Sequence, residues 1–150
     1  METRSTSEEI LRRTIEEFWE TFPSLWHNIR ARIREVATEE FDITVDQFHI
    51  LRRIHKGRDS VSKLAEAKHI SRPAISRSVD VMVNKGLVTR TQVPHDRRHV
   101  QLALTDEGNA LLEAIFSKNR DWMAGKLAIL DETELNTIQV AMQALSKTLG

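Results

Sequence analysis

The segment from Val61 to Arg90 constrains the fold of this 150-residue chain more than any other. It contains a short helical stretch, a turn, a second helical stretch and a glycine, Gly86, that ends the second helix. Ser71 is placed to cap the second helix, and Pro73 falls in its first turn, where no backbone donor is needed. We therefore expect a helix-turn-helix unit.

The second helix of this unit has two faces of different chemistry. Ile75, Val79 and Met82 share one face and are expected to pack inward. The other face carries small polar groups, a proline and two guanidinium groups, from Arg72, Pro73, Ser76, Arg77 and Asp80. Such a face suits the major groove of DNA, where a helix-turn-helix unit places its second helix. We interpret this helix as a recognition helix.

Two short stretches with strand character follow, over residues 87–92 and 99–104. In the second stretch Val100, Leu102 and Leu104 alternate with residues of another kind, as expected of a half-buried strand. A two-stranded hairpin directly after a helix-turn-helix unit is a wing. We therefore predict a winged helix-turn-helix.

The residues between the two strands, 93–98, form a basic segment with the composition of a turn. We expect this tip to lie beside the DNA backbone or the minor groove. Arg98 suits the minor groove, because the negative potential there attracts guanidinium groups. Asp96 lies two residues earlier and is spaced to hold Arg98 in a bidentate ion pair. We predict that Asp96 aims Arg98.

Charge is unevenly distributed along a chain whose formal net charge is +0. Residues 56–105 contain 10 Lys or Arg and 4 Asp or Glu, which gives +6. The rest of the chain contains 12 and 18, which gives −6. The basic part coincides with the helix-turn-helix and the wing, as expected of a nucleic-acid-binding surface.

The composition argues against several other classes of protein. The chain has no cysteine, which excludes disulfides, thiolate metal sites and a cysteine redox switch. Its five glycines are scattered and form no phosphate-binding loop. His95 beside Asp96 would lie on an exposed hairpin tip, where nothing excludes water from a general base. We expect no enzymatic activity and no cofactor. The N-terminus is charged and no run approaches a membrane span, so we expect a cytoplasmic protein with no membrane partner.

Both ends of the chain carry apolar stripes at helical spacing. The first runs from Leu11 to Val36 and keeps its phase across Pro23, which should kink or break the helix because it removes a backbone donor. A long helix can start at Thr105, and a further helix capped by Asp131 repeats apolar residues as a heptad seam at Leu135, Ile138, Met142, Leu145 and Leu149. Each stripe packs either on a partner subunit or within the chain, and the spacing leaves both possibilities open.

Capping signals place the remaining helices. Thr44 and Gln47 form a capping box that opens a helix through His55. Ser60 or Ser62 caps the first helix of the helix-turn-helix. No linker or repeat interrupts the chain, so we expect one interlocked unit.

Four motifs in this order and spacing resemble the MarR family of winged-helix transcription regulators. They are residues 71–80 (SRPAISRSVD), 85–90 (KGLVTR), 96–98 (DRR) and 102–108 (LALTDEG). A single helix-turn-helix match would be weak evidence, but four motifs in register are specific. The resemblance extends from about residue 8 to the C-terminus.

The resemblance implies a mainly α fold in a single MarR-type domain over residues 1–150. It places a winged helix-turn-helix with a two-stranded β wing at about 44–105, flanked by dimerisation helices at about 8–40 and 106–150. It also implies a sequence-specific DNA-binding regulator, a ligand-responsive repressor that binds a pseudo-palindromic operator as a homodimer. The residues that we expect to contact double-stranded DNA are Ser60, Ser62, Ser71, Arg72, Pro73, Ala74, Ser76, Arg77, Arg90, Asp96, Arg97 and Arg98.

Members of this family bind aromatic acids between the dimerisation helices and the winged domain, so the resemblance implies a small aromatic or anionic effector. The candidates are Trp19, Trp26, Arg30 and His49, because an indole platform near a guanidinium group suits a planar carboxylate. The alternative is that both tryptophans are interface core. Two rival functions stay open: a zinc-responsive regulator, although no histidine pair has helical metal-ligand spacing, and a winged-helix interaction module that has lost operator binding.

Overall fold

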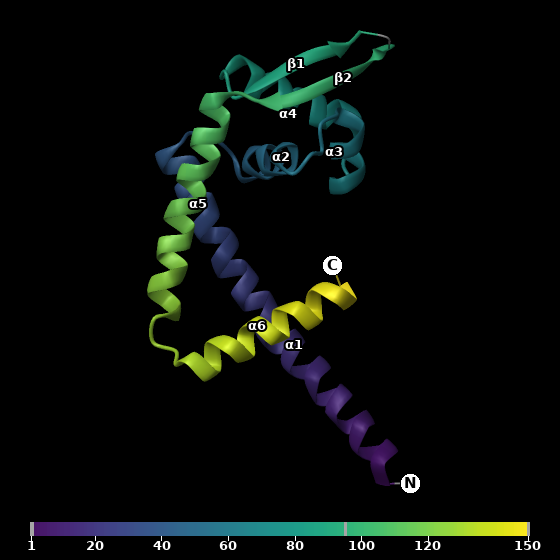
Figure 1. Ribbon diagram of the computed structural model, residues 1–150, viewed down its shortest axis with the longest axis vertical. Helices are drawn as coiled ribbons and strands as arrows, with labels where there is room; N and C mark the ends of the chain where they lie inside the picture. The colour runs from purple at the N-terminus through teal and green to yellow at the C-terminus, as the bar shows by residue number, and fades with distance from the viewer. Residues whose placement is uncertain (1, 95, 150) are drawn as a thin grey trace.

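The computed structural model describes residues 2–94 and 96–149, with the side chains of residues 6–94 and 100–149. The elements in chain order are α1 (Glu2–Glu35), a π-helical turn η1 (Val36–Glu40), α2 (Val45–His55), α3 (Val61–Lys68), α4 (Arg72–Asn84), β1 (Val88–Val93), β2 (Asp96–Leu104), α5 (Asp106–Leu127) and α6 (Glu132–Leu149). Figure 1 shows α2, α3, α4 and the hairpin gathered at one end, which we call the winged domain. The helices α1, α5 and α6 extend away from it, and we call them the arms. The predicted mainly α, winged helix-turn-helix fold is confirmed.

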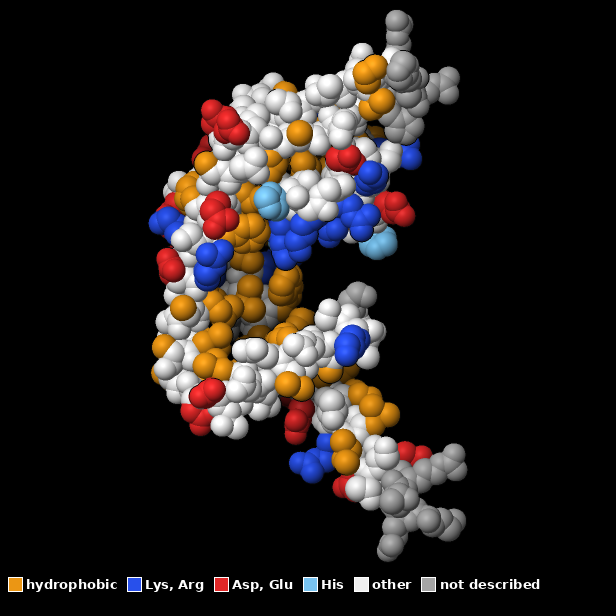
Figure 2. Space-filling view, in the orientation of Figure 1, with side chains coloured by type: hydrophobic (Ala, Val, Ile, Leu, Met, Phe, Trp, Pro, Cys, Tyr) orange, Lys and Arg blue, Asp and Glu red, His pale blue; other side chains and the backbone are white. Residues whose placement is uncertain are grey.

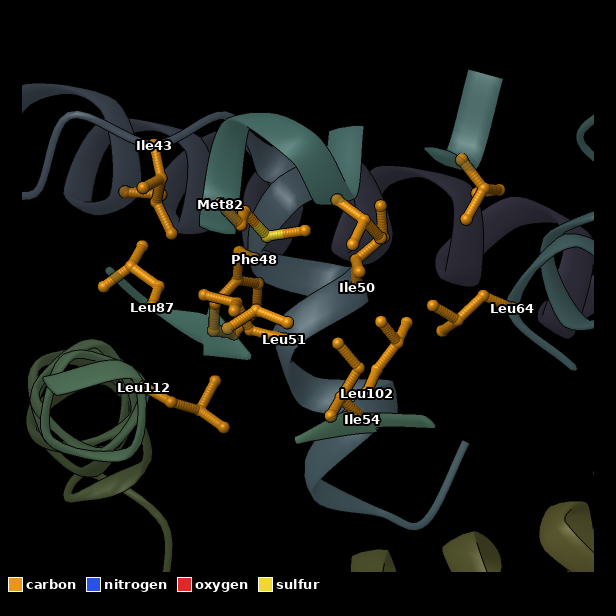
Figure 3. Close-up of a cluster of buried hydrophobic side chains, with 14 of the residues drawn as sticks. Ile43, Phe48, Ile50, Leu51, Ile54, Leu64, Met82, Leu87, Leu102 and Leu112 are labelled. Carbon is orange, nitrogen blue, oxygen red and sulfur yellow. The ribbon is translucent and has the colours of Figure 1, made fainter. Parts of the chain in front are cut away.

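The hydrophobic core lies within the winged domain and is closed by the bases of α1 and α5. Leu51 of α2, Leu64 of α3 and Leu102 of β2 are buried together with Ile115 of α5. Figure 3 shows side chains from α2, the hairpin and α5 pointing toward one another. Burying each such side chain contributes roughly 1.5–3 kcal/mol, so this cluster holds the winged domain together. The residues predicted to face inward from α4, Ile75, Val79 and Met82, are all buried.

Local capping signals are confirmed at the helix starts around the core. The Thr44 hydroxyl accepts a hydrogen bond from the Gln47 backbone at 3.1 Å, and the Gln47 side chain accepts one from the Thr44 backbone at 3.0 Å. Gly57, just after the end of α2, has φ of +87°, which a residue with a side chain rarely adopts. The capping box therefore starts α2 as predicted, and Gly57 follows its end.

The wing is longer than predicted and its turn is shorter. The strands pair from Val88 opposite Leu104 to Gln92 opposite Val100, and a register shift after Gln92 lets Val93 pair with Asp96. The backbone of residues 96–98 is therefore part of β2, and the prediction of a turn over all of 93–98 is wrong. Regular pairing would place Val93 opposite residue 99, so the shift spans three residues of β2 and lets the ladder continue toward the tip.

The first arm, α1, runs without a break through Pro23. Of the predicted kink or break, the break is wrong, because one missing backbone donor leaves the hydrogen bonds of the turns before and after it in place. Only the end of the apolar stripe reaches the core, where Val36 is buried and Ile33 packs against it. Phe18 and Ile29 of α1 are half-buried. Most of its other large apolar residues, such as Leu11 at 61% and Leu25 at 51%, are exposed. None of the described helices is long and apolar enough to cross a membrane.

The second arm, α5, is attached tightly to the end of the recognition helix. Thr105 donates its backbone N–H to the Leu87 carbonyl at 3.1 Å and its hydroxyl to the Gly86 carbonyl at 2.6 Å. The same hydroxyl accepts from Gly108 at 3.0 Å and caps α5 as predicted. A Cβ at Gly108 would lie 2.1 Å from the Leu87 carbonyl oxygen, so this close approach requires glycine.

The last arm, α6, begins at the predicted cap and has no buried residue. Asp131 and Glu134 exchange reciprocal backbone-to-carboxylate hydrogen bonds of 3.0 and 2.9 Å. Within the seam, Met142 is 56% exposed and Leu149 is 72% exposed. Figure 2 shows hydrophobic side chains exposed along the arms. Leu135, Ile138 and Leu145 are half-buried, so one chain covers the apolar face of α6 only in part.

Candidate nucleic-acid interface

The first helix of the helix-turn-helix begins at Ser60. The Ser60 hydroxyl accepts a hydrogen bond from the Lys63 backbone N–H at 3.2 Å, which identifies Ser60 rather than Ser62 as the cap. Ser62 lies in the first turn with its side chain exposed. Both hydroxyl groups therefore lie at the start of α3, where unpaired backbone N–H groups favour an anion such as a phosphate.

Asp59 ties this helix start to the wing, a role that our sequence analysis missed. Its carboxylate accepts from the Lys63 ammonium at 2.6 Å and from Gln101 at 3.3 Å, and its carbonyl accepts from the Leu102 backbone at 2.7 Å. The hydrogen bond from Lys63 lowers the pKa of Asp59. No local pattern reveals this role, because Gln101 and Leu102 are distant in sequence. The effect is to hold the N-terminus of α3 at a set distance from β2.

The recognition helix α4 presents the face that the sequence predicted. Ser71 occupies the N-cap position and Pro73 lies in the first turn, but the Ser71 side chain makes no capping hydrogen bond. Its hydroxyl is therefore exposed and not used by the helix. Arg72 and Arg77 are also exposed, and no acidic side chain in the described part of the chain forms an ion pair with either.

A hollow of about 550 Å³ separates the starts of α3 and α4 from the wing. It brings together five of the residues predicted to contact DNA, with two valines as its apolar part. Its lining consists of Ser60, Val61, Ser62, Arg72, Pro73, Ser76 and Val100. Hydroxyl groups and a guanidinium group around a shallow apolar floor form a surface that can donate to phosphates and to base edges.

Arg90 lies at the base of the wing and reaches back to α4. Its Nη1 atom is 2.5 Å from Oδ1 of Asp80, and its Nη2 atom donates to the carbonyl and the hydroxyl of Ser76 at 3.4 and 3.5 Å. Arg90 and Ser76 were each predicted at the interface, with no expected contact between them. The structure brings them together and adds Asp80 between recognition helix and wing.

The wing tip is only partly described. The backbone of Asp96, Arg97 and Arg98 is in β2, but their side chains lie outside the described residues. The predicted ion pair between Asp96 and Arg98 therefore stays a prediction. His95 and the side chain of His99 lie outside the described residues as well. Among the side chains that are described, no three of the metal-binding types come together.

The candidate effector residues are only partly gathered. His49 is half-buried on α2, and burial lowers its pKa, assisted by the nearby positive charges of Lys68, Arg52 and Arg30. Arg30 of α1 and His49 therefore lie within electrostatic reach of each other. Trp19 and Trp26 are 69% and 44% exposed on α1. They belong to the uncovered apolar surface of that arm.

Comparison with known proteins agrees with this architecture. The model of the MarR family matches residues 41–99. The chain is 30% identical to the HTH-type transcriptional regulator YhbI of Bacillus subtilis over 89% of this chain and 87% of that protein. It is 31% identical to the HTH-type transcriptional repressor MdtR of Bacillus subtilis over 75% of this chain and 72% of that protein.

The fold also matches a solved structure, that of a MarR family protein from Bacillus stearothermophilus. The TM-score is 0.81 at 24% identity, over 91% of this chain and 95% of that chain. These relatives are regulators of transcription and not enzymes. The helix-turn-helix, the wing and the similarity along almost the whole chain lead to one conclusion: this chain belongs to the MarR family of DNA-binding transcriptional regulators.

Proposed function

We propose that the chain is a homodimeric repressor that binds a pseudo-palindromic operator and leaves it when a small aromatic or anionic effector binds. One observation carries this proposal. The structure joins an exposed basic face on α4 to arms whose apolar faces are uncovered. The first feature suits DNA, and the second suits another copy of the chain.

The DNA contacts are proposed from both helices and from the wing. Arg77 is exposed in the middle of α4, where a guanidinium group can make a bidentate contact with guanine. The serine hydroxyls around the hollow are placed to donate to phosphates. The complete proposed set is Ser60, Ser62, Ser71, Arg72, Pro73, Ala74, Ser76, Arg77, Arg90, Asp96, Arg97 and Arg98.

The dimer is proposed from the arms. The large apolar side chains that α1 and α6 leave exposed would be covered if a second copy packed against them. Most homodimers have two-fold symmetry, so the two recognition helices would be related by that axis. Such a pair reads a palindromic site whose halves are about one helical turn, roughly 34–36 Å, apart.

The proposal of a repressor is supported by the name of a relative, and the proposal of an effector is supported by the positive charge near His49. The relative MdtR is named a repressor. Arg30 of α1 and His49 of α2 lie within electrostatic reach of each other, and Lys68 and Arg52 add positive charge there, opposed by Asp46. This excess of positive charge suits an anion. A carboxylate held there would touch both parts of the molecule. Trp19 and Trp26 complete the proposed effector set.

The decisive experiment starts with selection of duplexes from a random pool, followed by titration of the best duplex. We expect a dimer in sedimentation at micromolar concentration and a selected sequence with two-fold symmetry. Arg77→Ala should weaken binding by about 1–3 kcal/mol and relax the preference at one position per half-site. Lys63→Ala is the matched control, because Lys63 is paired with Asp59 and should not affect sequence preference. A monomer that binds every duplex equally would refute the proposal.

A separate experiment tests the effector. Benzoate, as a planar aromatic carboxylate, should release the selected duplex from the wild type at lower concentration than from Arg30→Ala. Methyl benzoate, which lacks the negative charge, is the matched control ligand. If benzoate releases both proteins equally, Arg30 is not part of an effector site.

A further inference from the structure

Arg90 is held by two groups of the recognition helix at once. Asp80 and Ser76 lie one helical turn apart on α4, and the guanidinium group of Arg90 reaches both from β1. The contact to the Asp80 carboxylate, at 2.5 Å, is much closer than the contacts to Ser76, at 3.4 and 3.5 Å. The carboxylate is therefore the main restraint on this side chain.

The restrained guanidinium group still has donors to spare. It has five N–H groups, and the observed contacts use only those of Nη1 and Nη2. The Arg90 side chain is 33% exposed and that of Asp80 is 51% exposed. Nε and the unused N–H groups remain for a further acceptor. The pair thus offers an oriented donor beside Ser76, which lines the hollow at the helix-turn-helix.

Asp80 is an unexpected residue on this face. An unpaired carboxylate on the outer side of a recognition helix would repel the phosphates of DNA. In the structure the Asp80 carboxylate forms an ion pair with the Arg90 guanidinium group, and this ion pair restrains the Arg90 side chain. We call the ion pair the clamp. This arrangement favours a role exerted through Arg90 and not through a base.

We infer that Asp80 is a positioning residue for operator binding: it holds the guanidinium group of Arg90 beside Ser76, where Arg90 donates to an operator phosphate. The inference rests on the proposed function, in which Arg90 contacts DNA. A free arginine side chain loses rotamer freedom when it binds, and the ion pair removes part of that freedom before DNA arrives. Asp80 therefore strengthens binding although its charge has the wrong sign.

This sign provides the test. Asp80→Asn removes a negative charge near DNA, so charge counting predicts tighter binding, whereas loss of the clamp predicts binding about threefold to tenfold weaker. Glu66→Gln is the matched control. Glu66 is exposed on α3, and no described cation forms an ion pair with it. The Glu66→Gln variant should bind DNA as tightly as the wild type or slightly more tightly.

The same substitution in an Arg90→Ala background separates a clamp from a direct contact. In that background the Arg90 guanidinium group is absent, so Asp80→Asn cannot free it from the ion pair. We therefore expect DNA binding that is unchanged or tighter. Arg90→Ala itself should lower the slope of log affinity against log salt by about 0.9, as for one lost phosphate contact. A merely structural role would leave that slope unchanged. Thermal melting of each variant, which we expect to stay near that of the wild type, checks the fold.

Two outcomes would overturn the inference. If Asp80→Asn tightens binding as Glu66→Gln does, Asp80 only repels DNA. If it weakens binding equally with and without Arg90, Asp80 acts on DNA directly or through the fold. All titrations use the duplex selected by the wild-type dimer. A wild type that selects no duplex would contradict the proposed function instead, so the two failures are distinguishable.

Discussion

The winged domain and the arms contain similar apolar residues at similar helical spacing but use them differently. In the winged domain such residues are buried, with Leu51 and Leu64 at 0% exposure. On the arms they are open, with Trp19 at 69% and Leu149 at 72%. Figure 2 shows this exposed apolar surface along the arms. One part of the molecule therefore completes its core within a single chain, and the other needs a further surface.

Charges placed in the apolar seam of α6 test whether the arms need a second copy of the chain to cover them, and they should have the largest effect. Leu145→Asp with Leu149→Asp should raise the dissociation constant of the proposed dimer by about 100-fold or more, because each buried, unpaired charge costs several kcal/mol. Sedimentation over a range of concentrations measures this. Val140→Asp is the matched control, since Val140 is also exposed but lies on the opposite face of the helix. A double variant that stays dimeric would place the seam outside the interface.

The junction between the two parts depends on one glycine. Gly108→Ala should destabilise the protein by about 2–3 kcal/mol, because the new Cβ would overlap the Leu87 carbonyl oxygen and force α5 away from the wing. Gly125→Ala on the same helix meets nothing within 4 Å, and it should stabilise the protein by roughly 0.5–1 kcal/mol. Denaturant unfolding at one fixed protein concentration compares them. Equal effects at both positions would show that the close approach at Gly108 is unimportant.

Within the winged domain, two serines at helix starts should differ. Ser60→Ala removes the hydrogen bond to the Lys63 backbone and should lower the free energy of unfolding by about 1 kcal/mol. Ser71 makes no such bond, so Ser71→Ala should change stability by only a few tenths of a kcal/mol, roughly the effect of an exposed substitution. The same unfolding experiment measures both. A large loss for Ser71→Ala would mean that its hydroxyl caps α4 in solution.

The smallest expected effect is a pH dependence from His49, between an arm and the winged domain. Burial lowers its pKa below 6.5, and the charges of Lys68, Arg52 and Arg30 act in the same direction, opposed by Asp46. As pH falls, the unfolded chain takes up a proton at His49 before the folded chain does. The free energy of unfolding should therefore decrease from about pH 6.5 down to the lowered pKa.

His49→Gln should remove this part of the pH dependence. His27→Gln, which removes an exposed imidazole, is the matched control. Unfolding by denaturant at several pH values between about 5 and 8 covers the range in which histidine titrates. An unchanged slope in His49→Gln would show that His49 is not the group responsible.

Local sequence signals predicted the helix starts and ends well. The capping box at Thr44, the caps at Thr105 and Asp131 and the glycine stop at Gly86 all involve partners within a few residues. Such partners are in contact whenever the helix forms, so their spacing is sufficient evidence. The wing turn was predicted less well, because strand pairing extends until geometry stops it, and residue type does not mark that point.

The remaining contacts could be learned only from the folded chain. Asp59 meets Gln101, Arg90 meets Asp80, and the start of α5 meets Leu87 because the core brings distant segments together. Nothing in the local pattern separates Asp80 from any other exposed helix residue. Periodicity and caps depend on neighbours along one helix, so the sequence was enough to identify them. The clamp on Arg90, the anchor at Asp59 and the uncovered faces of the arms depend on how helices pack, and only the tertiary structure decided them.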